Sequence, residues 1–228
     1  MRIALIADYN PASETHRFTE SAVQHSATFL GLEVQAHWVN TSEISDHLFS
    51  EVDAIWVAPG SPYKDTEKVF RVIRYARENK VPCFGTCGGF QHMVIEYARH
   101  VLGIHDAEHA ENAPSGSRLI ISRLDCSLRF REMTLSFAPN SLVATYYGAL
   151  SATEKYYCNF GINPEFVPLL KTSDFGVVGS DAEGEIRVME LVGHPFYVGT
   201  LYVPQSRSTV EAPHPLVTGF LRAIYEWR

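Results

Sequence analysis

One cysteine in the sequence lies in a setting that would make a thiol reactive. Cys87 stands in the run Gly85-Thr86-Cys87-Gly88-Gly89, between a short apolar stretch and a segment with helical periodicity. This is the G-x-C-x-G form of a nucleophile elbow, in which flanking glycines allow a close backbone approach that β-carbons would crowd. The amino end of a helix favours a thiolate, and the Gly88 amide would donate to a developing oxyanion. The pattern predicts Cys87 as a nucleophile.

A thiolate nucleophile needs a base, and the chain contains ten histidines. His194 is the best placed by local pattern, because it follows the apolar residues 188–192 in the run Gly-His-Pro-Phe. Catalytic groups in open α/β sheets gather at strand ends. We therefore predict that His194 is the general base for Cys87.

Other residues allow competing chemistry. Residues 105–109 fit the pattern H-x-x-E-H of some zinc peptidases, but Gly103 indicates that the preceding helix has already ended. Cys83 is spaced C-x-x-x-C from Cys87 and falls in a predicted strand, which favours core packing over a redox role. We expect neither a metal ion nor a cofactor.

The elements that must position these residues alternate between strand and helix in the first hundred residues. Continuous apolar runs predict buried strands, and apolar residues at helical spacing predict helices. The expected strands are residues 3–7, 34–39, 53–58 and 81–85, and the expected helices are 15–30, 66–79 and 88 to about 102.

The second half of the chain is richer in strands. Strands are expected at residues 119–122, 132–137, 175–180 and 187–192, a closing helix at 215–227, and long loops at 112–117 and 205–214. Strand–helix alternation of this kind predicts an α/β fold, with an open, mostly parallel sheet and helices on both faces. Without a linker or repeat, residues 1–228 are predicted to form a single domain.

Composition narrows the class of protein. Of 228 residues, 26 are acidic and 19 basic, a formal charge of −7, which argues against nucleic acid or an anionic membrane as partner. The apolar start is too short for a signal peptide, and no run is long enough to span a membrane. Four cysteines do not suggest a disulfide framework, so we expect a cytoplasmic protein.

Several segments together resemble one family, the class I glutamine amidotransferases, and within it the glutaminase domain of CTP synthase. They are RIALIADY at the start, the APG that ends at Gly60, GTCGGFQHMVIEYARHVLG around Cys87, DAEHAE, INPEF, GHPF and PHPLVTGF. The resemblance implies a flavodoxin-like fold and a role in pyrimidine nucleotide biosynthesis. The sequence has no phosphate-binding G-x-x-x-x-G-K-(S/T) loop, so we expect a stand-alone glutaminase-like protein without the synthetase domain.

The resemblance also implies roles for individual residues. Cys87 would be the nucleophile and His194 the base, with the amides of Ser61 and Gly88 as the oxyanion hole. The substrate-binding positions would be Gly60, Gln91, Glu111, Asn159 and Phe160, with Glu111 receiving the α-amino group of the substrate.

Two positions depart from the family pattern. The family reads His-Pro-Glu, with the glutamate orienting the histidine, whereas Phe196 follows His194-Pro195 here. Asn159 stands where the family has the arginine that holds the carboxylate of glutamine. A neutral amide cannot replace the two-pronged charge of guanidinium, so glutamine should bind poorly unless Arg99, Arg129 or another cation reaches the site.

Three functions therefore remain open. The first is a glutaminase that passes ammonia to a separate synthetase subunit. The second is an amidase of the same thioester mechanism that acts on another amide or a γ-glutamyl compound. The third is a catalytically silent relative that binds a small molecule or a partner and regulates it.

Overall fold

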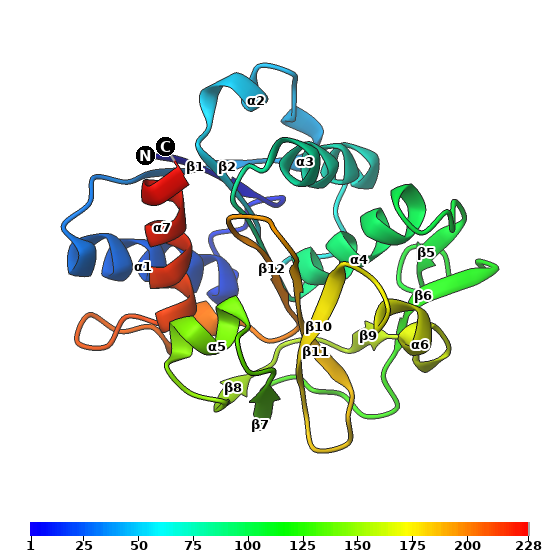
Figure 1. Cartoon of the computed structure of the whole chain (residues 1–228). Coiled ribbons are helices and arrows are strands. Elements are labelled where there is room, and N and C mark those ends of the chain that lie inside the picture. The colour runs from blue at the N-terminus through cyan, green and yellow to red at the C-terminus, as the bar shows by residue number, and fades with distance from the viewer. Residues whose placement is uncertain (228) are drawn as a thin grey trace.

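A nine-stranded sheet forms the centre of the protein in this computed structural model, which describes residues 1–227 (Figure 1). The strand order is β2-β1-β3-β4-β12-β11-β10-β7-β8. The strands are β1 (Arg2–Ile6), β2 (Gln35–Val39), β3 (Ala54–Val57), β4 (Cys83–Thr86), β7 (Glu132–Phe137), β8 (Ser151–Lys155), β10 (Phe175–Ser180), β11 (Ile186–Leu191) and β12 (Tyr197–Thr200).

The sheet has a parallel half and an antiparallel half. The pairings from β2 through β1, β3 and β4 to β12 are parallel, and those from β12 through β11, β10 and β7 to β8 are antiparallel. The predicted α/β fold is confirmed, but the sheet is mixed and not mostly parallel. Short loops join β10 to β11 and β11 to β12, and a short loop can connect only antiparallel neighbours.

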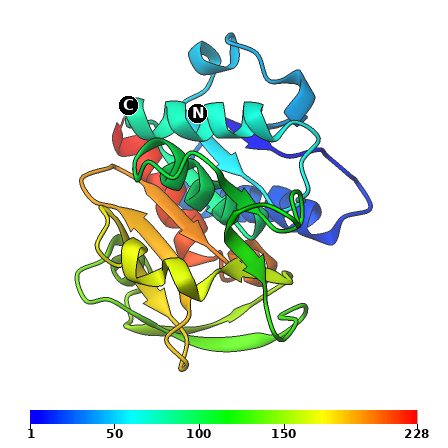
Figure 2. The ribbon, with the colours of Figure 1, turned by 90° about the vertical axis from the view of Figure 1, so that its right-hand side faces the viewer.

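Helices cover both faces of the parallel half, as predicted. Helices α1 (Glu14–Leu30) and α7 (Pro215–Trp227) pack together on one face, and α3 (Thr66–Asn79) and α4 (Gly88–His100) pack together on the other (Figures 1 and 2). Strands β1, β3 and β4 between them are buried almost completely. Their uninterrupted apolar runs are explained by this double coverage.

Smaller elements complete the fold. A three-stranded sheet contains β5 (Ala107–His109), β6 (Arg118–Arg123) and β9 (Phe160–Ile162) in the order β5-β6-β9. The short helices are α2 (Leu48–Glu51), α5 (Leu142–Tyr147) and α6 (Val167–Leu170), with 3₁₀ turns η1 (Thr41–Glu43), η2 (Pro164–Phe166) and η3 (Pro204–Arg207). Within residues 1–227, no helix has both the length and the apolar character needed to cross a membrane.

One element missed by the sequence analysis matters for the site. No strand was predicted after Gly193-His194-Pro195, but residues 197–200 form β12 in the middle of the sheet. It lies directly beside β4, so its two ends decide which residues reach Cys87.

Candidate active site

Cys87 occupies a strained turn between β4 and α4. Its backbone angles are φ 54° and ψ −111°, a region that residues with a β-carbon rarely adopt. Its backbone N–H donates to the Thr200 carbonyl at 2.8 Å, which fixes the turn to the end of β12. The geometry is that of the predicted nucleophile elbow, with the thiol at the amino end of a thirteen-residue helix.

The glycines of this turn are required by space. A β-carbon on Gly89 would overlap the Val57 carbonyl, and one on Gly85 would overlap the Met93 sulfur. On Gly88 it would lie 3.0 Å from the Ser61 Cβ and 3.2 Å from the Ser61 backbone nitrogen. Gly88 and Ser61, the two predicted oxyanion donors, are therefore direct neighbours.

The loop that carries Ser61 is held in place by two side chains. The Nε2–H of His16 donates to the Pro59 carbonyl at 2.9 Å, while its Nδ1 accepts from the Asn10 amide at 3.0 Å. The Tyr63 hydroxyl donates to the Ala58 carbonyl at 2.5 Å. Burial lowers the pKa of His16, so this imidazole is neutral and serves to position the loop.

A pocket of about 420 Å³ opens above the thiol. Its lining includes all the predicted substrate-binding residues together with Cys87 and Ser61, and it also includes Arg129, one of the cations considered above for the substrate carboxylate. The full lining is Ser13, Glu14, Thr15, Pro59, Gly60, Ser61, Cys87, Gln91, Glu111, Arg129, Tyr157, Cys158, Asn159 and Phe160.

Gln91 is held by a buried chain of hydrogen bonds. Its Nε2 donates to the Phe160 carbonyl at 2.8 Å, and its Oε1 accepts from the Nε2–H of His109 at 3.0 Å. The Nδ1 of His109 accepts from the Glu111 amide at 3.0 Å. Burial lowers the pKa of His109 to about 3, so this histidine is neutral and both its nitrogens are engaged.

The structure contradicts the prediction that His194 is the base. His194 precedes β12, whereas Cys87 follows β4, and the parallel register pairs Tyr197 with Cys83 and Thr200 with Thr86. The two side chains thus lie at opposite ends of the paired strands β4 and β12. The length of a four-residue strand, about 13 Å, separates them.

His194 has a structural role at the far end of β12. Its Nε2–H donates to the Ala76 carbonyl at the end of α3 at 3.1 Å, and its Nδ1 accepts from the Phe196 amide at 3.2 Å. Burial lowers the pKa of His194, which keeps the ring neutral. It joins the β11–β12 turn to α3.

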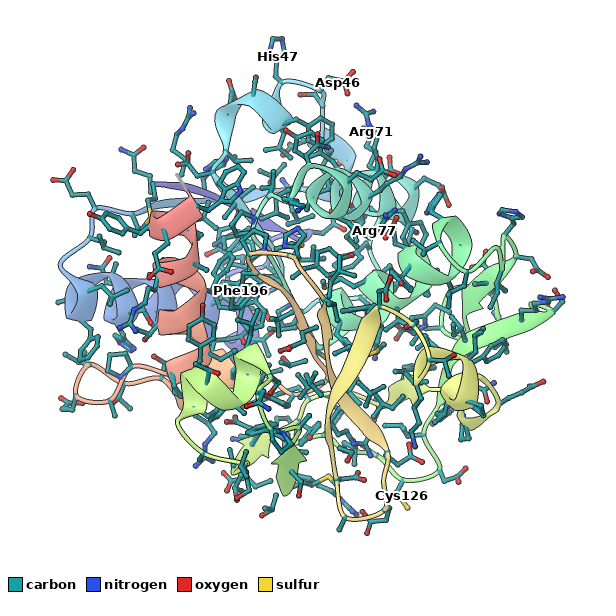
Figure 3. All side chains as sticks on the ribbon, in the orientation of Figure 1. Asp46, His47, Arg71, Arg77, Cys126 and Phe196 are labelled. Atoms are coloured by element: carbon teal, nitrogen blue, oxygen red, sulfur yellow. The ribbon has the colours of Figure 1, made fainter. Side chains whose placement is uncertain are left out.

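Phe196 is likewise a core residue and not a replacement for a catalytic glutamate. It is fully buried and packs against Phe84, Phe220 and Tyr146, beneath α7 and α5 (Figure 3). The match of Gly-His-Pro-Phe to the His-Pro-Glu pattern of the family was therefore wrong.

The run Val203-Pro204-Gln205 follows the carboxyl end of β12, which is the end that lies beside Cys87. The Thr200 carbonyl accepts from the Cys87 amide, and the Gln205 Nε2 donates to the Thr86 hydroxyl at 3.2 Å, so residues 200–205 pass beside the nucleophile. Proline occupies the same central position as in His-Pro-Glu, with Val203 before it and Gln205 after it. In the sequence, the proline that follows the mostly apolar residues 197–203 could have indicated that residues 203–205 correspond to His-Pro-Glu.

Within residues 1–227, no histidine lines the pocket. Of the two arginines considered for the substrate carboxylate, Arg129 lines the pocket and Arg99 does not. Arg99 lies on the outer part of α4, where it pairs with Glu67 and Glu108. Arg129 makes no ion pair within the described residues and rests on the Phe130 ring at 5.4 Å. Within residues 1–227, it is the one guanidinium that lines the pocket.

Residues 105–109 also lack the geometry of a zinc site, which needs both histidines on one face of a helix. These residues run into strand β5, so His105 and His109 do not share a helix face. Within residues 1–227, no cluster of histidine, cysteine, aspartate and glutamate side chains could hold a metal ion.

The class of protein follows from the fold together with comparisons with known proteins. The family model described as "Glutamine amidotransferase class-I" matches residues 15–223, so the chain belongs to the class I glutamine amidotransferases. Its curated relatives include the CTP synthases of Haloarcula hispanica, at 32% identity, and Coprothermobacter proteolyticus, at 33% identity, each over 97% of this chain. The chain spans only 42% and 44% of the length of these two relatives.

Solved structures agree on the fold. The glutaminase domain of Trypanosoma brucei CTPS with bound acivicin matches with a TM-score of 0.91, at 20% identity, over 99% of this chain and 94% of that one. A glutamine amidotransferase of Thermotoga maritima matches with a TM-score of 0.63, at 10% identity, over 100% of this chain and 97% of that one. Within its family, the chain is thus similar to the glutaminase domain of CTP synthase.

Proposed function

We propose that the pocket above Cys87 binds a small amide or γ-glutamyl compound, and that the protein is a binding or regulatory member of its family that hydrolyses amides poorly. The observation that carries this proposal is the combination of an intact elbow with a pocket whose lining, among the residues that the structure describes, contains no imidazole. Without a base and acid beside the thiol, an amide nitrogen cannot be protonated as it leaves.

The charges in the pocket suit an amino-acid-like ligand. Arg129 is the cation available for a carboxylate, in place of the arginine that Asn159 replaces. Glu111 and Glu14 provide carboxylates for an ammonium group. The side-chain amide of such a ligand would then reach Cys87, where the amides of Ser61 and Gly88 surround its carbonyl oxygen.

A second candidate is amide hydrolysis, with ammonia passed to a separate synthetase. It is favoured by the strained elbow and by the proximity of Gly88 and Ser61, whose amides could stabilise an oxyanion. In this case Cys87 would attack the carbonyl carbon, and water would later release the acid from the thioester.

Binding and turnover can be measured on the same protein. Calorimetry with glutamine and with γ-glutamyl amides should detect binding that Arg129→Gln weakens about tenfold or more, because a charge-assisted bond contributes about 1.5–3 kcal/mol. Arg131→Gln is the matched control, since this arginine lines a different pocket. Ammonia release should stay at the level of Cys87→Ser.

Ammonia release well above that level, and lost in Cys87→Ser, would establish the second candidate instead. His194→Gln separates the two mechanisms further. If this substitution abolished a Cys87-dependent release without unfolding the protein, the assignment of His194 to the far end of β12 would be wrong.

A further inference from the structure

The candidate pocket contains a second thiol that the proposed function does not use. Cys158 lies in the segment between β8 and β9 and lines the pocket together with Cys87. The two side chains are 5% and 9% exposed, so both are sheltered but neither is sealed from the pocket. All four cysteines of the chain are free thiols.

Backbone contacts bring the two cysteines to the same place. The Cys87 amide donates to the carbonyl of Thr200, and the Cys158 thiol donates to the carbonyl of Leu201, the next residue, at 3.5 Å. Cys158 also lies close enough to Cys87 for the two thiols to interact electrostatically. The two sulfurs are therefore neighbours across the floor of the pocket, although 71 residues of sequence separate them.

The two thiols differ in their surroundings. The interaction with Cys87 and burial raise the pKa of Cys158 well above that of an ordinary thiol, so Cys158 stays protonated. Cys87 stands at the amino end of α4, beside Gly88 and Ser61, and is the more exposed of the two thiols. This asymmetry gives each sulfur a distinct task.

We propose that Cys87 and Cys158 form a redox-active dithiol that reduces a hydroperoxide and closes to a disulfide across the pocket. The Cys87 thiolate attacks the terminal oxygen of the hydroperoxide, so that the O–O bond breaks and an S–O bond forms. The alkoxide that leaves takes up a proton to become an alcohol, and Cys87 becomes a sulfenic acid.

The second step resolves this intermediate. The sulfur of Cys158 attacks the sulfenic sulfur of Cys87, an S–S bond forms, and the hydroxide that leaves takes the proton of Cys158 to become water. In total two thiols are oxidised and one hydroperoxide is reduced to an alcohol and water. An external dithiol returns the pair to its reduced form.

The disulfide would also remove the thiol from the ligand pocket. Binding or covalent capture at Cys87 would then occur only in the reduced protein. The inference shares this pocket with the proposed function, but it needs no amide ligand.

The test uses the fully reduced protein and one equivalent of hydrogen peroxide or cumene hydroperoxide. We expect the loss of two free thiols per oxidant, and non-reducing peptide mass spectrometry should map a Cys87–Cys158 disulfide. Cys158→Ser should instead accumulate a dimedone-reactive sulfenic acid at Cys87. Cys87→Ser should consume peroxide at least tenfold more slowly.

Cys126→Ser is the matched control, because Cys126 is an exposed thiol at the rim of the molecule (Figure 3). It should leave the disulfide yield unchanged. A disulfide that maps to Cys126, or equal dimedone labelling of the wild-type protein and Cys158→Ser, would overturn the inference. Calorimetry on reduced Cys158→Ser keeps the result separate, since ligand binding there tests only the proposed function.

Discussion

At the residue scale, we expect the identity of residue 203 to limit what Cys87 can do. Residues 200–205 are anchored beside the nucleophile at both ends, by the Thr200 carbonyl and by the Gln205 side chain. Val203 between them is apolar and fully buried, so it offers no proton acceptor. Gln205 gives its Nε2 to the hydroxyls of Thr19 and Thr86 and carries no charge to orient an imidazole.

The position of residue 203 predicts a gain of activity in a double variant. Val203→His combined with Gln205→Glu should raise ammonia release from a bound amide about 100-fold over the wild-type protein, because a positioned general base contributes about 10²–10⁴-fold. Val203→Asn with Gln205→Glu is the control that adds polarity without a base. An unchanged rate in a variant that remains folded, with Cys87 still labelled by a thiol reagent, would mean that residue 203 does not face the nucleophile.

At the element scale, α4 must be held firmly because its first turn carries the thiol. Arg77 of α3 (labelled in Figure 3) makes a two-pronged ion pair with Glu96 of α4, at 3.0 Å and 2.8 Å. Glu96 is fully buried. A buried carboxylate that loses its partner is strongly unfavourable.

Arg77→Met should therefore lower the free energy of unfolding by about 3–5 kcal/mol. Urea denaturation measures this loss, and the double substitution Arg77→Met with Glu96→Met should recover most of it, because the buried charge is gone. A single substitution that costs under about 1 kcal/mol would show that water reaches Glu96.

At the scale of the whole molecule, several histidines are buried in their neutral form. Burial lowers the pKa of His92 to about 4 and that of His109 to about 3, and it also lowers the pKa of His16 and His194. In the unfolded chain these groups take up protons near pH 6.5. The unfolded state therefore binds more protons than the folded state between pH 6.5 and about 4, and stability falls as the pH falls through this range.

His92→Phe should make the free energy of unfolding depend less steeply on pH, because the unfolded state would take up one proton fewer. His92 donates from Nδ1 to the Gly88 carbonyl and packs against Tyr63 and Phe70, so an aromatic ring should fit its place. The free energy of unfolding, measured in urea at pH 7, 6 and 5, should change less with pH in this variant. Equal slopes for both proteins would mean that His92 is protonated in the folded state.

Local sequence determined most of the elements and the elbow. The helices 66–79 and 215–227 and the strands 132–137 and 175–180 were predicted with the bounds that the structure shows, because their periodicity and end signals are local. The Gly-Thr-Cys-Gly-Gly run likewise determined the turn at Cys87, since only glycines fit beside Val57 and Ser61.

The partners of Cys87 were decided by the tertiary structure. A histidine beside a proline looks the same at either end of a strand, and only the register of β12 against β4 shows that His194 lies at the far end and residues 200–205 at the near one. The approach of Cys158 and Arg129 depends on how residues 124–160 fold over the sheet, which no local pattern encodes. Spacing along the chain determines conformation, whereas contacts between distant segments depend on packing of the complete sheet.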